Sequence, residues 1–161
     1  MPVKPHDDNM DELADRIVAS MTDFAGALGR LNDLIAQHLG IAQTDLLCLH
    51  ALNRAGASTA GALSSQLGRT TGAVTHMIDR LEKAGYVRRQ PDPRDRRRVL
   101  VEASTSGLER IASFYEGIDA RSRRLMATFS DDQLATIHTF LLSGYEDATE
   151  ECDHLVRQRG R

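Results

Sequence analysis

Residues 70–98 combine three local patterns that only a small number of folds accommodate in direct succession. Apolar residues recur at helical spacing through the first half, and Gly85 is placed to end that helix. Tyr86-Val87 then begins a strand, Val99–Val101 forms the returning strand, and Gln90–Arg98 is the expected turn between them. The sequence therefore predicts a helix that leads directly into a two-stranded hairpin with an arginine-rich tip.

Helical periodicity accounts for most of the remaining chain. A long amphipathic helix is predicted first, with residues 1–10 expected to be frayed before it and Gly40 placed to end it. The predicted helices cover, in chain order, residues 11–39, 43–54, 59–67, 70–84, 104–129 and 131–155. The residues suited to cap the third, fourth and last helices are Ser58 or Thr59, Thr70 and Ser130. In the fourth helix the expected inward-facing residues are Ala73, Val74, Met77, Ile78 and Leu81.

This order of elements predicts a mainly α fold with a small β-hairpin, in three parts: residues 1–40, 41–103 and 104–161. The middle part is a helix–turn–helix with a hairpin wing, and the outer parts are long helices. Such helices cannot bury their apolar stripes on so small a middle domain, and two-fold symmetric pairing is the commonest solution. We therefore expect a homodimer with interleaved N- and C-terminal dimerisation helices. A single monomeric helical bundle is the alternative.

Positive charge is concentrated in the hairpin of an otherwise acidic chain. Residues 86–98 hold six arginines against Asp92 and Asp95, a local charge of +4, whereas the whole chain carries −3. Residues 131–153 contain seven acids and no lysine or arginine. One compact basic element on an acidic body suggests a directed contact with a polyanion, although a solvated charge run has the same composition.

The third and fourth helices, with Gly68 in the turn between them, have the length and spacing of a helix–turn–helix. The second of them presents six candidate contact residues on its polar side: Thr70, Thr71, Gly72, Thr75, His76 and Arg80. Short side chains at a helix N-terminus permit close approach to a phosphate or a base edge. Arginines of the wing suit a narrow minor groove, and Asp95 is expected to hold a neighbouring guanidinium in a fixed direction. Pro91 and Pro93 are expected to stiffen the tip of the hairpin.

Residues 40–107 resemble the winged helix–turn–helix of the MarR family, the bacterial multiple-antibiotic-resistance regulators. The stretches that carry the resemblance are GIAQTDLLCLHAL, TAGALSSQLGRTTGAVTHMIDRLEKAGYV and DPRDRRRVLVEASTSG. It implies a homodimer on double-stranded DNA, at a pseudo-palindromic operator, with recognition helices in major grooves and wings in minor grooves. It also assigns Asp95 and Arg97 to the fixed wing pair, with Arg97 in the minor groove. The residues assigned to phosphates are Arg94, Arg96 and Arg98.

Three positions depart from the pattern of that family. Arg69 replaces the usual apolar residue before the cap of the recognition helix. His76 stands where arginine or lysine is frequent, which leaves the base preference at this position open. Ala42 replaces a common serine or threonine cap, which favours a later start of the second helix.

The function that follows is a dimeric, sequence-specific DNA-binding transcriptional regulator, and most members of the family are repressors. The resemblance implies release by a small phenolic or lipophilic effector, bound between the dimer helices and the winged domain. Two alternatives stay open, a dimeric winged-helix module that binds protein and a protein that binds nucleic acid without sequence preference. The last is disfavoured because basic charge is scarce outside the wing and an aromatic content of 4% leaves few side chains to stack on bases.

Other classes of function lack their motifs in this sequence. No nucleophile–base pair, carboxylate pair or phosphate-binding loop is recognisable, so we predict no enzyme activity and no cofactor. Cys48 lies on an apolar helix and is predicted to be buried, while the acids around Cys152 disfavour a reactive thiolate. No apolar run approaches the roughly 20 residues of a membrane helix, and the polar N-terminus lacks a signal core, so we expect a cytoplasmic protein. No metal site is predicted, because no local ligand set is formed by His6, His38, His50, His76, His138 and His154.

Overall fold

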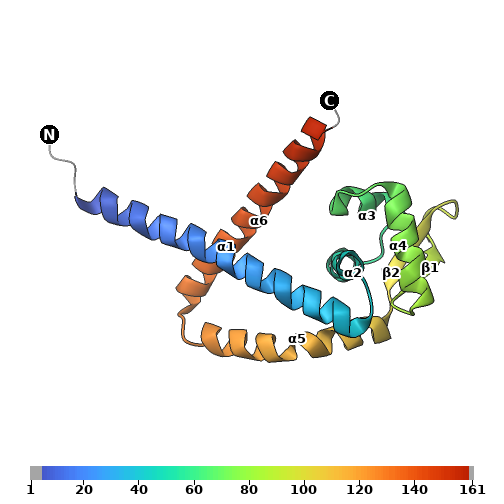
Figure 1. The fold of residues 1–161 in the computed structure, drawn as a ribbon, viewed down its shortest axis with the longest axis horizontal. Helices are drawn as coiled ribbons and strands as arrows, with labels where there is room; N and C mark the ends of the chain where they lie inside the picture. The colour runs from blue at the N-terminus through green and yellow to red at the C-terminus, as the bar shows by residue number, and fades with distance from the viewer. Residues whose placement is uncertain (1–4, 160–161) are drawn as a thin grey trace. The chain divides into compact units, whose positions relative to one another are not determined.

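The computed structural model describes residues 5–159, with side chains described from residue 10 to residue 158. In chain order its elements are α1 (Pro5–Leu39), α2 (Gln43–Ala55), α3 (Ala60–Leu67), α4 (Thr71–Lys83), β1 (Val87–Pro91), β2 (Val99–Ala103), α5 (Thr105–Met126) and α6 (Asp131–Arg159) (Figure 1). Two compact units divide within α2, between Leu46 and Leu47. The predicted fold class, mainly α with one small hairpin, is confirmed. The predicted three-part division after residues 40 and 103 stays a prediction.

The first helix begins earlier than the sequence predicted. It starts at Pro5 rather than Asp11, so residues 5–10 are helical and not frayed, and residues 1–4 lie outside the described part of the chain. Proline is favoured at the first helical position because the N–H it lacks would have no partner within the helix. The backbone of α1 is therefore helical further toward the N-terminus than the apolar periodicity indicated.

The end of α1 is fixed by backbone geometry at Gly40, as predicted. Gly40 has a φ of 68° and its N–H donates to the carbonyl of Gln37 at 3.1 Å. The N–H of Ile41 donates to the carbonyl of Ala36 at 3.0 Å, which completes a Schellman motif. The large apolar side chains that stay exposed along this helix are Met10, Leu13, Ile17, Val18, Met21, Phe24 and Leu34.

The second helix begins at Gln43, although Ala42 offers no side-chain cap. The carbonyl of Ala42 accepts from the N–H of Asp45 at 2.9 Å and from that of Leu46 at 3.1 Å. Backbone bonds alone therefore start α2, and the later start inferred from the missing cap is wrong. Cys48 is buried in this helix, as predicted.

The helix–turn–helix follows the caps that the sequence predicted. The Thr59 side chain accepts from the N–H of Ala62 at 3.2 Å, and the Thr70 side chain accepts from that of Ala73 at 3.3 Å. Gly68 ends α3 in the left-handed region, with φ 59° and ψ 37°. Ala73 is exposed, so its predicted place on the inner face of α4 is wrong. The buried residues of the two helices are Leu63, Val74, Met77, Ile78 and Leu81.

The two predicted strands form an antiparallel hairpin, in which Val87 pairs with Ala103 and Pro91 pairs with Val99. A further bridge joins Ser58, in the segment before α3, to Val101 of β2. Each of those two residues donates its N–H to the carbonyl of the other, at 2.9 and 2.8 Å. The hairpin is therefore held to the helix–turn–helix by its inner strand.

The predicted turn was too long, because Gln90 and Pro91 belong to β1. Proline cannot donate to a ladder, but Pro91 occupies the last pair of this one. The next bond is made by Asp92, whose N–H donates to the carbonyl of Arg98 at 2.9 Å. The turn therefore spans only residues 92–98, and the stiffening attributed to Pro91 acts on the strand rather than on the tip.

A tight joint connects the hairpin to α5. Ser104 caps α5 by accepting from the N–H of Gly107 at 3.0 Å, and its hydroxyl donates to the carbonyl of Gly85 at 2.7 Å. Its own N–H donates to the carbonyl of Tyr86, a buried residue, at 2.8 Å. A Cβ added at Gly107 would lie 2.8 Å from the Ser104 hydroxyl and 3.0 Å from the Tyr86 Cα. The joint therefore requires glycine at position 107.

The last two helices meet at a capped corner. The helix α5 ends at Met126 rather than continuing to Phe129, because the N–H of Phe129 bonds back to the carbonyl of Met126 at 3.1 Å. Ser130 and Gln133 then form a reciprocal capping box at 2.9 and 3.3 Å, which starts α6 where the sequence predicted. The large apolar side chains left exposed on α6 are Ile137, Phe140, Leu141, Leu142, Tyr145, Leu155 and Val156.

Polar contacts tie α2 to both of these helices. His50 shares a hydrogen bond of 3.0 Å with the hydroxyl of Tyr115 on α5. Arg54 donates to the hydroxyl of Tyr145 on α6 at 2.5 Å, and its guanidinium lies 4.6 Å from the centre of that ring. None of the described helices is long and apolar enough to cross a membrane.

Candidate nucleic-acid interface

The N-terminal half of the exposed face of α4 consists mainly of small side chains. All six candidate contact residues of the predicted recognition helix are exposed, from Thr70 to Arg80. Sequence reasoning missed Ala73 and Asp79, which are exposed on the same helix. The spacing of Thr71, Thr75 and Asp79 at steps of four is a signal in the sequence that could have placed Asp79 on this face. Whether these residues contact DNA stays a prediction.

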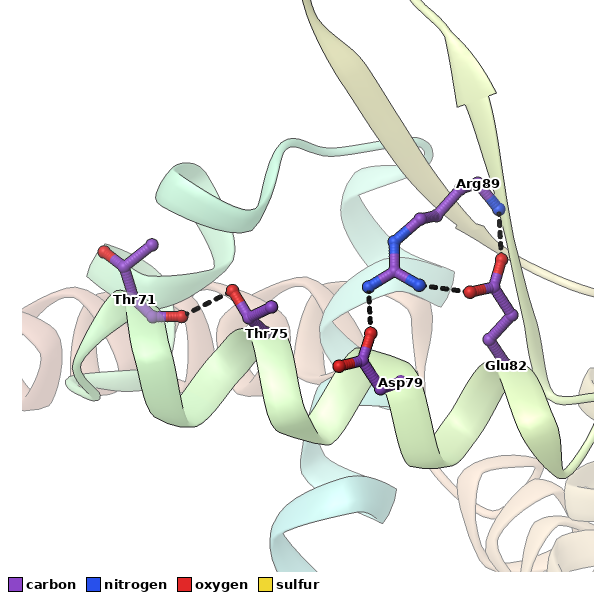
Figure 2. A network of polar contacts seen from close by, with 5 residues as sticks. All are labelled: Thr71, Thr75, Asp79, Glu82 and Arg89. Atoms are coloured by element: carbon purple, nitrogen blue, oxygen red, sulfur yellow. Dashed lines mark hydrogen bonds and ion pairs between the residues drawn. The ribbon is translucent and has the colours of Figure 1, made fainter.

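Two features of this face bear on close approach to a ligand. The hydroxyl of Thr75 donates to the carbonyl of Thr71 at 2.9 Å (Figure 2), so its oxygen is left as an acceptor and its donor is occupied. A Cβ added at Gly72 would meet nothing within 4 Å, so packing does not require glycine there. Since glycine costs about 1 kcal/mol of helix propensity against alanine, position 72 is more easily explained by a contact outside the chain.

A network of ion pairs joins the base of the wing to α4. Arg89 of β1 donates through Nη2 to Asp79 Oδ1 at 2.5 Å and through Nη1 to Glu82 Oε2 (Figure 2). Its backbone N–H also donates to Glu82 Oε1, at 3.3 Å. The hydrogen bond to Asp79 is the largest of the influences that raise the pKa of Arg89, so this guanidinium stays charged. These contacts were not foreseen from the sequence.

Two aspartates shape the turn of the wing through backbone bonds. Buried Asp92 accepts from the N–H of Arg94 at 2.9 Å, and its other oxygen lies 3.9 Å from Nε of Arg98. Asp95 accepts from the N–H of Arg97 at 3.0 Å, and its carbonyl accepts from that of Arg98 at 2.8 Å. Asp95 was expected to hold a guanidinium, but its carboxylate holds the backbone instead, because aspartate readily bonds the N–H two residues on.

The arginines of the hairpin fall into two groups. Arg88 pairs with Glu102 across the hairpin, and Arg89 pairs with the carboxylates of α4, so the charge at the base of the wing is compensated. The other four arginines are exposed in the turn: Arg94, Arg96, Arg97 and Arg98. Arg98 lies near the carboxylate of Asp92, so the remaining positive charge of residues 88–98 is carried by Arg94, Arg96 and Arg97 at the tip of the wing.

The part of the chain that contains α4 and the tip of the wing matches a known protein family. The sequence model of the MarR family matches residues 41–99. The multiple antibiotic resistance protein MarR of Escherichia coli (strain K12) is 33% identical over 102 residues, which are 62% of this chain and 69% of that protein. The chain belongs to the MarR family.

Two further proteins match over a greater length of this chain. An HTH-type transcriptional regulator of Bacillus subtilis (strain 168), YcgE, is 38% identical over 120 residues, which are 74% of this chain and 78% of that protein. The structure of a MarR family protein from Bacillus stearothermophilus superimposes with a TM-score of 0.65 at 20% identity, covering 86% of this chain and 97% of that one. As a MarR-family member the protein is a DNA-binding transcriptional regulator and not an enzyme, as predicted.

The MarR-family match includes every residue of the predicted DNA contact surface, since all of them lie between residues 70 and 98. Elsewhere, the described side chains contain no group of three or more His, Cys, Asp or Glu that could hold a metal ion. His6 lies outside the described side chains, and the absence of a metal site stays a prediction. Cys152 is exposed on α6.

Proposed function

We propose that this MarR-family regulator is a dimeric repressor that binds a pseudo-palindromic operator through α4 and the wing. The observation that carries the proposal is the pairing of a small-residue helix face with exposed arginines at an adjacent hairpin tip. Close approach of a helix face and insertion of arginine into a narrow groove are complementary ways to contact one duplex. In this proposal α4 mainly contacts bases, and the wing mainly supplies the electrostatic attraction to the DNA backbone.

The N-terminal half of α4 reads the major groove. Thr70, Thr71, Gly72, Thr75 and His76 approach base edges and phosphates, and Arg80 contacts the duplex further along the helix. Because the hydroxyl hydrogen of Thr75 is given to the Thr71 carbonyl, Thr75 offers an acceptor and a methyl group to the bases. His76 is the residue on this face whose ring can both donate and accept.

The wing supplies the minor-groove and phosphate contacts. Arg97 enters the minor groove, and Arg94, Arg96 and Arg98 bind flanking phosphates. Asp95 contributes indirectly, because it fixes the backbone at Arg97 and so sets the direction in which that side chain leaves the turn. Exposed arginines have few competing partners, so their charge is available to displace counterions from DNA.

Dimerisation occurs through the long helices. Their support is the series of exposed large apolar side chains on α1, α5 and α6, which would otherwise remain in water. A two-fold partner covers such stripes with the same stripes of a second copy. Two recognition helices then address half-sites about one helical turn, or about 34 Å, apart, which makes the operator a pseudo-palindrome.

A small phenolic or lipophilic effector releases the DNA by changing the spacing of the two winged domains. The contacts of α2 with α5 and α6, through His50–Tyr115 and Arg54–Tyr145, support this part of the proposal. They connect the winged domain to the helices that form the dimer, so a ligand that disturbs them alters the distance between recognition helices. A modest change suffices because half-site spacing is fixed by the pitch of DNA.

The test begins with selection of an operator from a random duplex library by the unmodified protein. Replacing Arg97 with Ala should then weaken binding about tenfold or more, because a groove contact is worth about 1–3 kcal/mol. Arg88→Ala is the matched control, since Arg88 is already paired with Glu102 and should change affinity much less. Chromatography with light scattering should give the same dimer for all three proteins.

Two results would contradict the proposal. Unchanged affinity of the Arg97→Ala protein at physiological salt would remove the wing from the interface. If the logarithm of affinity is flat against the logarithm of salt concentration, phosphate contacts are absent. A dimeric winged-helix module that binds protein would then be the better account.

A further inference from the structure

The face of α4 that is proposed to approach DNA carries two carboxylates. Thr71, Thr75, Asp79 and Glu82 follow one another at steps of four, four and three, so they form one stripe along the helix (Figure 2). All four are exposed. A carboxylate beside a phosphodiester backbone is repelled, and like charges across an interface weaken association. The lower half of this stripe is therefore unfavourable for DNA unless its charge is compensated.

Arg89 provides that compensation from the neighbouring strand. Its two terminal nitrogens bind Asp79 and Glu82 separately, and its backbone N–H binds Glu82 as well. Only 31% of the Arg89 side chain is exposed, against 54% for Asp79 and 39% for Glu82. A guanidinium already committed to two carboxylates has few donors left for a phosphate.

We propose that Arg89 is a positioning residue for DNA binding: it screens the carboxylates of Asp79 and Glu82 from the duplex without contacting DNA itself. This role presupposes the proposed contact of α4 and the wing with DNA. Arg89 would then increase the affinity for DNA although its guanidinium does not contact the DNA. The hairpin and the recognition helix are thereby presented to the duplex as one surface of reduced negative charge.

The adjacent Arg88 provides an internal comparison. It lies on the same strand and pairs with Glu102, its cross-strand partner in the hairpin. The carboxylate that it compensates belongs to β2 rather than to α4. Arg88→Gln therefore removes the same charge from the same strand but leaves the carboxylates of the recognition helix compensated.

The experiment measures affinity for the duplex that the unmodified protein enriches from a random library. Arg89→Gln should bind about tenfold more weakly, since two uncompensated carboxylates then face the DNA. The triple variant Asp79→Asn, Glu82→Gln, Arg89→Gln should recover to within about threefold of the unmodified protein, because it has no uncompensated carboxylate left at these positions. Arg88→Gln should stay within about threefold as well.

Recovery in the triple variant separates screening from other roles of Arg89. If Arg89 bound a phosphate, or served only to hold the fold, the triple variant would bind as weakly as Arg89→Gln, and the inference would be wrong. Thermal unfolding of each variant checks that the fold is retained. Should Arg89→Gln not fold, the double variant Asp79→Asn, Glu82→Gln still decides: affinity equal to or above that of the unmodified protein supports screening, and weaker binding overturns it.

A further arm distinguishes failure of this inference from failure of the proposed function. Arg97→Ala should weaken binding whatever Arg89 does. If Arg97→Ala weakens binding and Arg89→Gln does not, the screening role is wrong while the wing contact stands. If neither variant changes affinity, the proposed DNA contact surface is itself wrong.

Discussion

The winged domain and the C-terminal helices have similar apolar patterns but differ in how far the apolar side chains are buried. On α4 the apolar residues are enclosed by the same chain, and Val74 and Leu81 are fully buried. On α6 residues of the same kind remain open, with Leu141 57% exposed. Periodicity predicts both helices equally well, but it does not show whether the apolar face is buried by the same chain or by a partner. The winged domain buries its apolar residues within one chain, whereas the apolar residues of α6 stay exposed, and the proposed dimer would cover them.

Removing a core side chain from the winged domain should have the largest effect. Leu81→Ala should lower the free energy of unfolding by about 2–5 kcal/mol, because the cavity it leaves is closed on all sides. Urea unfolding followed by circular dichroism measures this. Leu47→Ala, at a position 43% exposed, is the matched control and should cost under about 1 kcal/mol. Equal losses at the two positions would show that burial within this chain does not set the cost of the truncation.

A charge placed in the α6 stripe should act on assembly instead. Leu141→Glu should weaken the proposed dimer about a hundredfold, since a central apolar anchor is replaced by a carboxylate that the partner would have to bury. Sedimentation velocity over a range of protein concentrations measures the dissociation constant. Thr139→Glu places the same charge on the same helix at a polar position, and should have much less effect. A Leu141→Glu protein that stays fully dimeric would exclude this part of α6 from the interface.

The smallest predicted effect concerns the junction between the two regions. Burial lowers the pKa of His50 below its ordinary value of 6.5, so the unfolded chain binds more protons than the folded one in the window just below pH 6.5. Stability should therefore be fully present above this window and should fall as pH drops through it. Unfolding at a series of pH values should show a shallower decline for His50→Gln than for the unmodified protein. His138→Gln, an exposed position on α6, should leave the slope unchanged, and an identical slope in both variants would contradict the prediction.

Local chemistry was readable from the sequence wherever a few neighbouring residues decide the structure. Thr70 was predicted as a cap, and Thr59 as one of two candidates with Ser58, because a hydroxyl before a helix satisfies an N–H that has no partner within it. Gly68 and Gly85 were predicted as helix ends because both need a positive φ, as they have in the structure. The Asp95 bond to the backbone of Arg97 belongs to the same local class, and consideration of turn chemistry rather than of salt bridges would have found it.

Contacts that depend on docking were not readable in this way. Arg89 meets Asp79 only because the hairpin lies against α4, and no spacing rule for a helix or a strand brings these two residues together. The same reason applies to α2 and α6, where Arg54 meets Tyr145 across a long stretch of chain. The sequence therefore predicted correctly which segment carries the positive charge of the wing. It did not show which arginines of that segment form ion pairs with carboxylates of the same chain.

The close packing at Gly107 has a mechanical consequence. With the Ser104 hydroxyl bonded on both sides and no space for a side chain at position 107, the first turn of α5 cannot rotate without carrying Tyr86 and the strand that follows it. The helix α5 has 22 residues, a length of about 33 Å at about 1.5 Å per residue. A tilt of about 5° about the far end of such a rod moves its near end by about 3 Å. A small angular change at the α5–α6 corner is thus converted into a displacement of the arginine tip that is comparable to the length of a hydrogen bond.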